Sequence, residues 1–139
     1  MDINIPPLKN EYTRYLYYTS YLVGISSMVS FYHRDYTTFV YMFILFLTSI
    51  NYWNNPAPGW RRDIDKFVCK IINVYFYETT LFFQNEFRHQ VFVNTLWHVL
   101  FLYFLEWIYF YYQNPSWIII HMMLHFYLSF SVPFVLYIL

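Results

Sequence analysis

The chain has 139 residues and no net charge, and 59% of its residues are hydrophobic, 27% aromatic and only 12% charged. Soluble domains carry about 25% charged residues, so this composition leaves too little polar surface for a water-soluble globule and predicts a membrane protein. No basic run exceeds Arg61-Arg62, which argues against a nucleic-acid partner, and the single cysteine, Cys69, excludes an internal disulfide.

Charged residues fall in clusters, and the segments between these clusters have the length of membrane spans. In chain order, five segments are predicted to be spanning helices: 15–32, 37–53, 66–83, 91–112 and 116–138. The segment 66–83 contains Lys70, Asn73 and Glu78, so a helix lying along the membrane interface is the alternative there and would leave four spans. The sequence therefore predicts an all-α, multi-pass transmembrane helix bundle formed by one domain, residues 1–139.

Turn and capping residues separate these segments. The run 54–59 contains two prolines and a glycine and predicts a turn. Asp63 is the predicted cap of the third helix, and Asn114 followed by Pro115 is the predicted start of the fifth. Pro133 lies inside the last segment and is expected to kink it near its end.

The distribution of basic residues predicts the orientation of the bundle. If the chain has five spans, five lysine and arginine residues lie on one side of the membrane: Lys9, Arg14, Arg61, Arg62 and Lys66. Two, Arg34 and Arg88, lie on the other side. Because lysine and arginine are enriched in inner loops, the N-terminus is predicted inside and the C-terminus outside. Four of the five tryptophans also fall on the inner side: Trp53, Trp60, Trp107 and Trp117.

Small and hydroxyl side chains follow one face of the first segment. Thr19, Ser26 and Ser30 share that face, and Ser20 and Gly24 form a pair of small residues four apart. Such spacing favours close packing between membrane helices, with hydroxyl groups forming hydrogen bonds across the contact.

Polar and ionisable residues inside the spans predict one candidate site. His121 and His125 are four residues apart on a helix, so both imidazoles point the same way and can share a metal ion. Glu106, Ser49 and Asp65 are predicted at the same depth on three other helices. A structural alternative is open, in which Asp65 interacts with its helix dipole and Glu106 pairs with Arg61 or Arg62.

The sequence also resembles two groups of membrane proteins. The run SINYWNNPAPGWRRDID (49–65), together with HMMLH (121–125), is similar to small multi-pass membrane proteins of large DNA viruses, a resemblance that implies no activity. Ser49, Asp65, His121 and His125 more distantly resemble the alkaline ceramidase-like superfamily of membrane hydrolases, also called CREST. That resemblance implies a zinc ion held by His121 and His125, with Asp65 and Ser49 as catalytic residues, but Trp53 stands where the superfamily has a third histidine. Glu106 or Asp63 would have to replace that ligand.

These observations favour a structural or accessory component of a viral or intracellular membrane, without enzymatic activity and with no expected cofactor. The expected partner is the lipid bilayer. One alternative is a metal-dependent membrane lipid hydrolase, with zinc at His121 and His125. Another is a small subunit of a respiratory complex in the mitochondrial inner membrane, with other membrane subunits as partners. This last alternative is suggested by abundant Phe, Tyr, Ile and Asn, whose codons are AT-rich.

Overall fold

The computed structural model describes residues 10–57 and 59–139, and every regular element in this part of the chain is helical. In chain order the helices are α1 (Asn10–Tyr32), α2 (Tyr36–Asn54), α3 (Trp60–Thr80), α4 (Glu86–Tyr111) and α5 (Trp117–Pro133), followed by the π-helical segment η1 (Phe134–Ile138). Each of the five predicted segments falls on one of these helices, so the all-α prediction is confirmed. Lys9 and Pro58, which belonged to the predicted inner side and to the predicted turn, lie outside the described residues.

The start of α3 differs from the prediction. Gly59, rather than Asp63, occupies the N-cap position, and its φ of 141° is a conformation that residues with side chains rarely adopt. Asp63 lies in the first turn of α3, where it is exposed and accepts a hydrogen bond from Arg62 Nε at 3.2 Å. The capping role predicted for Asp63 is therefore wrong, although its position near the helix N-terminus still suits a negative charge.

Both ends of the last helix are explained by local chemistry. The Asn114 Oδ1 atom accepts a hydrogen bond from the Ser116 backbone N–H at 3.0 Å, and α5 begins at Trp117. Pro133 has no backbone N–H, and the chain continues from it as the wider turn η1. Arg88 of α4 donates to the carbonyl oxygens of Val135 (2.8 Å from Nε) and Leu136, so a cation stabilises carbonyl groups in this last turn.

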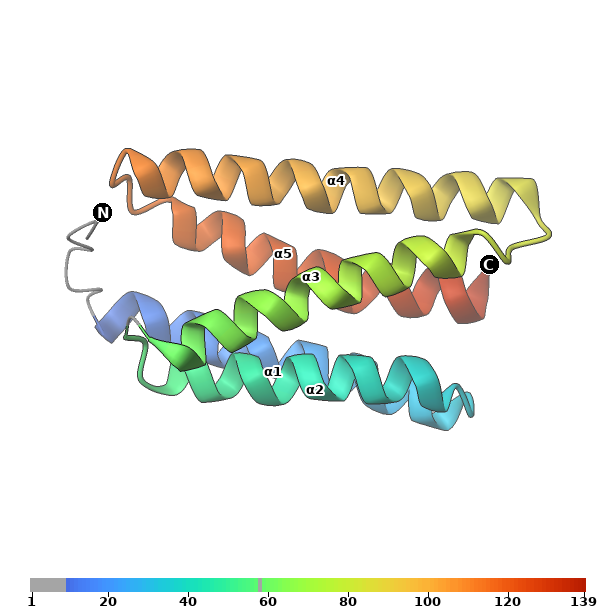
Figure 1. The fold of residues 1–139 in the computed structure, drawn as a ribbon, viewed down its shortest axis with the longest axis horizontal. Helices are drawn as coiled ribbons and strands as arrows, with labels where there is room; N and C mark the ends of the chain where they lie inside the picture. The colour runs from blue at the N-terminus through green and yellow to red at the C-terminus, as the bar shows by residue number, and fades with distance from the viewer. Residues whose placement is uncertain (1–9, 58) are drawn as a thin grey trace.

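The five helices form a closed ring. Each helix packs against the next one along the chain, and α1 also packs against α5. Figure 1 shows that consecutive helices run in opposite directions. The beginning of α1, the α2–α3 connection and the α4–α5 connection therefore lie at the end of the bundle on the left of that view.

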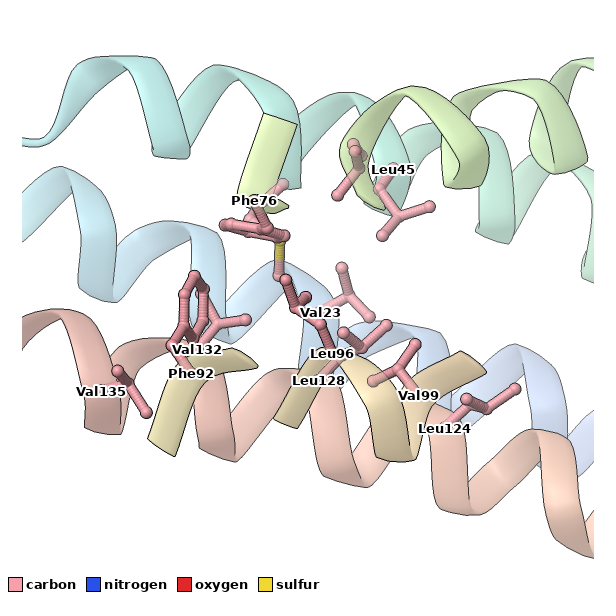
Figure 2. Close-up of a cluster of buried hydrophobic side chains, with 12 residues drawn as sticks. Val23, Leu45, Phe76, Phe92, Leu96, Val99, Leu124, Leu128, Val132 and Val135 are labelled. Carbon is pink, nitrogen blue, oxygen red and sulfur yellow. The ribbon is translucent and has the colours of Figure 1, made fainter. Parts of the chain in front are cut away.

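Two apolar clusters fill the inside of this ring. The first draws on all five helices and includes the fully buried rings of Phe76 and Phe92, with centroids 5.8 Å apart (Figure 2). The second cluster is smaller and lies nearer the beginning of α1; its buried members are Leu16, Tyr52, Trp53, Trp117 and Ile118. Trp53 and Trp117 are thus core residues, whereas Trp60 and Trp107 are exposed.

Among the described residues, two helical segments are long and apolar enough to cross a membrane: α4, and α5 continued by η1 (Trp117–Ile138). The mean hydropathy of the other three helices is below that of a typical membrane span. Tyrosine, serine and threonine are frequent in α1 and α2, and α3 carries several charges. This finding supports an association with a membrane and leaves the predicted number of five spans to be tested.

Candidate functional site

A layer of polar side chains crosses the inside of the ring between the two apolar clusters. On α1, Thr19 and Ser20 lie between Leu16 of the second cluster and Val23 of the first. On α2, Ser49 lies in the corresponding place, before the aromatic residues at the end of the helix. The layer is therefore closed on both sides by apolar side chains, which lowers the local dielectric and strengthens the electrostatic interactions within it.

An ion pair joins α4 to α5 in this layer. His121 Nδ1 lies 2.8 Å from Glu106 Oε1, and the two side chains are only 14% and 19% exposed. The rings of Trp53 and His121 pack edge to face, with their centroids 5.0 Å apart. Glu106 thus pairs with His121, and neither Arg61 nor Arg62, the partners considered from the sequence, forms this pair.

His125 joins α5 to α1. Its Nδ1 atom lies 2.8 Å from the Thr19 hydroxyl, which itself donates to the carbonyl oxygen of Leu16 at 3.2 Å. A hydroxyl group has only one hydrogen to donate. When both bonds are formed, Thr19 must accept from His125, so the proton of the neutral imidazole is on Nδ1 and Nε2 is left as an acceptor.

Two further hydrogen bonds connect α2 to its neighbours. The Ser49 and Ser20 hydroxyl groups are 2.8 Å apart, which joins α2 to α1. The Thr48 hydroxyl lies 3.2 Å from Asp65 Oδ1, which joins α2 to α3, and it also donates to the Leu45 carbonyl oxygen at 3.1 Å. Asp65 is 5% exposed, so its carboxylate is buried. Among the described residues its hydrogen-bond partner is the Thr48 hydroxyl, whose single hydrogen is shared with the Leu45 carbonyl oxygen.

A small cavity lies inside this layer. Its polar lining consists of six side chains: Ser49, Asp65, Cys69, Tyr103, His121 and His125. The centre of a water molecule can occupy a volume of about 20 Å³ in this cavity, which is enough for about one water molecule. The cavity is thus the size of a single small molecule or ion and leaves no space for an acyl chain.

The structure brings together most of the residues singled out from the sequence. Ser49, Asp65, His121 and His125 line the same cavity, and Glu106 binds His121 from outside it. Sequence reasoning did not place the partners of these residues in the site. Thr19 was recognised only as part of a small packing face, and Thr48, Cys69 and Tyr103 carry no spacing signal that would have identified them.

The described side chains do not form a zinc site as they stand. No three His, Cys, Asp or Glu side chains in residues 10–57 and 59–139 come together in a way that could hold a metal ion. Glu106, the candidate third ligand, is bonded to His121, and Trp53 fills the space beside that ring. Structural zinc sites have four protein ligands and catalytic ones three, so zinc at His121 and His125 remains a prediction that this arrangement does not favour.

A second polar cluster closes the opposite end of the ring. Asp35 caps α2 by accepting from the Thr38 backbone N–H at 3.1 Å, and it accepts a second bond from the Tyr137 hydroxyl at 3.0 Å. The His33 ring stacks on Tyr137 with centroids 4.4 Å apart. These contacts hold the C-terminal turn against the α1–α2 connection, which is a structural role.

No protein-family model matches the chain, and neither a curated protein nor a solved structure is significantly similar to it.

Proposed function

We propose that the chain is an integral membrane protein in which all five helices cross the bilayer and whose role is structural or accessory. The observation that carries this proposal is the outer surface of the ring, where large apolar side chains are exposed on every helix. One strongly exposed example from each of α1 to α5 is Ile25, Val40, Val74, Phe101 and Phe130. Monomeric soluble proteins rarely expose contiguous apolar patches above a few hundred Å², whereas a lipid-facing surface requires them.

The inside of the ring supports the same proposal. Polar groups within the hydrocarbon layer need partners, and several buried polar side chains pair across helices, as His121 does with Glu106, His125 with Thr19 and Ser20 with Ser49. Apolar side chains outside and paired polar side chains inside suit a bundle surrounded by lipid.

The lower hydropathy of three helices is compatible with five spans. Tyrosine scores as polar on hydropathy scales, yet it is enriched at membrane interfaces, and α1 and α2 contain many tyrosines. In α3 the charged side chains of Arg61, Arg62, Asp63 and Lys66 lie in the first two turns, where they would reach the inner headgroups. The proposed orientation places this end of the ring, together with Arg14, on the inner side.

The size of the cavity favours a structural role over lipid hydrolysis. Room for about one water molecule leaves a lipid carbonyl group no access to Ser49 or Asp65. The hydrolase alternative is nevertheless favoured by one observation, that Ser49, Asp65, His121 and His125 line the same cavity. Elemental analysis of the purified protein separates the two: stoichiometric zinc that is lost in a His121→Ala/His125→Ala variant would overturn the structural role.

Spin labels on the outer surface test the membrane arrangement helix by helix. In a Cys69→Ser background, single cysteines at Ile25, Val40, Val74, Phe101 and Phe130 would be labelled and the protein reconstituted into vesicles. Each label is expected to be more accessible to molecular oxygen, which dissolves in lipid, than to a water-soluble nickel complex.

Labels at Asp63 and Gln113, both exposed at the inner end of the bundle, are the matched controls and should show the reverse. A label at Val74 that is reached mainly by the nickel complex would refute a spanning α3. The same result at Val40 or Ile25 would refute the five-span bundle as a whole.

A further inference from the structure

The hydrogen of the Ser49 hydroxyl, which lines the cavity, is directed away from it. Ser20 donates to the Leu16 carbonyl oxygen at 2.8 Å, so its 2.8 Å contact with Ser49 requires Ser49 to be the donor. Ser49 lines the cavity, and with its hydrogen directed at Ser20 it presents only oxygen lone pairs to that space. The Tyr103 hydroxyl and the Cys69 thiol line the cavity as well, and each can accept a hydrogen bond as well as donate one.

The two imidazoles are oriented in the same sense. The Nδ1 atoms of His121 and His125 bind Glu106 and Thr19, and neither of these partners lines the cavity. The opposite ring edge of each histidine, with Nε2, is therefore the edge available to the cavity. Nε2 of His125 is a free acceptor in the tautomer that Thr19 imposes, whereas His121, as the cation of the ion pair with Glu106, carries a hydrogen on both ring nitrogens and offers no acceptor.

Asp65 adds negative charge to the same wall. It is buried, and its described hydrogen-bond partner is the Thr48 hydroxyl on Oδ1, which leaves Oδ2 unsatisfied. A buried carboxylate is costly by several kcal/mol unless a positive charge compensates it, and the positive charge that acts most strongly on Asp65 is that of His121, which also pairs with Glu106. Glu106 carries a second carboxylate nearby and is paired with His121, while Lys66, the neighbour of Asp65 in the chain, is exposed.

We propose that this cavity is a binding site for one small cation that donates hydrogen bonds, for which ammonium is the stable representative. Its wall offers acceptors from Ser49, Asp65 and His125, in a space the size of one water molecule. The two carboxylates of Asp65 and Glu106 face one cationic ring, His121, so the buried layer has a net negative charge that one monovalent cation would neutralise. Ammonium has about the size of water and can donate four hydrogen bonds, so it would satisfy these three acceptors.

The composition of the wall distinguishes this ligand from metal ions. Calcium and magnesium need six or more oxygen ligands, whereas the wall offers three acceptors, one of which is an imidazole nitrogen. The directional lone pairs of an imidazole, a hydroxyl and a carboxylate suit an N–H donor better than an alkali ion. Zinc would need three or four ligating side chains brought together, and the described residues do not provide that set.

Thermal unfolding of the purified protein in detergent at near-neutral pH tests the proposal. Ammonium chloride would be titrated against sodium chloride at constant ionic strength, with potassium and tetramethylammonium chlorides in parallel series. A ligand that binds only the folded state raises the melting temperature by mass action. We expect a saturable rise of a few degrees in ammonium, and none in potassium or in tetramethylammonium, which has no N–H and is too large.

Variants show whether the effect arises in the cavity. Asp65→Asn should abolish the ammonium effect and Ser49→Ala should weaken it, while Asp63→Asn, an exposed carboxylate two residues earlier on the same helix, should leave it unchanged. If Asp65→Asn does not fold, the wild-type protein in ¹⁵N-ammonium provides a second readout, because bound ammonium should give a ¹H–¹⁵N signal separate from that of free ammonium.

Four results would overturn the proposal, and the first three concern ammonium itself. These are an equal rise in potassium, an unchanged ammonium effect in Asp65→Asn, and the absence of both a selective rise and a bound ¹⁵N signal in the wild-type protein. Stabilisation by zinc without any effect of ammonium would also overturn it and would favour the hydrolase alternative. None of these results depends on the number of helices that cross the membrane, so the proposed function is tested separately.

Discussion

Replacing Glu106 by alanine removes the partner of His121 at the junction of α4 and α5. Exposed ion pairs contribute about 0–1 kcal/mol, and breaking a fully buried pair costs about 3–5 kcal/mol because the remaining charge is left unpaired. The His121–Glu106 pair is 2.8 Å long, with side chains 14% and 19% exposed, and is therefore close to the buried limit. We expect Glu106→Ala to lower the free energy of unfolding by about 2–3 kcal/mol.

A double-mutant cycle separates the pair from other effects of the substitution. His121→Phe keeps a ring of similar size against Trp53 but removes the nitrogen that binds Glu106. The cycle of Glu106→Ala, His121→Phe and the double variant should give a coupling energy of about 1–2 kcal/mol. Glu106→Gln keeps an acceptor for the His121 N–H, so it should lose less stability than Glu106→Ala.

Thermal unfolding in detergent, followed by circular dichroism, measures these differences. For a chain of this size, 1 kcal/mol corresponds to about 3–4 °C, so Glu106→Ala should melt roughly 6–12 °C below the wild-type protein. Glu78→Ala, which removes an exposed carboxylate from α3, is the matched control and should stay within about 0.5 kcal/mol. The effects of the two single substitutions on the free energy of unfolding could be additive, or Glu106→Ala could be as stable as the wild-type protein. Either result would refute the claim that the pair stabilises the contact between α4 and α5.

Three further substitutions test the packing of the ring, each by the same unfolding measurement. Gly24→Leu should destabilise by about 1–3 kcal/mol, because even a Cβ atom at Gly24 would lie 3.1 Å from the Phe46 ring. Phe92→Ala should destabilise by about 3–5 kcal/mol, since Phe92 is fully buried in the first apolar cluster. Arg88→Gln removes the charged donor to two carbonyl groups of η1, which should cost about 1–2 kcal/mol and accelerate amide hydrogen exchange in residues 134–138.

Each of these variants has a control, which is exposed for Phe92 and Arg88 and is half-buried, like Gly24 itself, for Gly24. Leu22→Phe, Phe87→Ala and Arg34→Gln should each change stability by less than about 0.5 kcal/mol. If Gly24→Leu lowered the free energy of unfolding no more than Leu22→Phe does, α1 would have to pack through another face. Slow exchange in residues 134–138 of Arg88→Gln would mean that the other contacts of η1, including those of Tyr137 with Asp35 and His33, are sufficient to hold it.

The helices themselves were predictable because the charges of this chain are clustered. The gaps between charged clusters fall on all five helices, and Pro133 marks the place where the last helix changes its turn. The start of α3 was not predictable in this way. Asp63 has the chemistry of a cap, but the helix begins earlier because Gly59 adopts a backbone conformation that other residues avoid.

The candidate site was predictable in part for a related reason. Helix spacing places His121 and His125 on one face, and the span lengths place Ser49, Asp65 and Glu106 at similar depth. The pairing within the layer depends on how each helix is rotated about its axis and on the contact of α1 with α5, which closes the ring. The bond between Thr19 and His125 joins residues more than a hundred positions apart, and no periodicity in the sequence indicates it.

The central claim, that the ring crosses the membrane five times, is tested most directly by the location of two points on the chain. One reporter would be inserted at Ala57, between α2 and α3, and another fused after Leu139. Five spans predict that the Ala57 reporter is inside and the Leu139 reporter outside. Labelling of both from the same side would contradict the claim, since it would mean that α3 does not cross and that the chain has four spans.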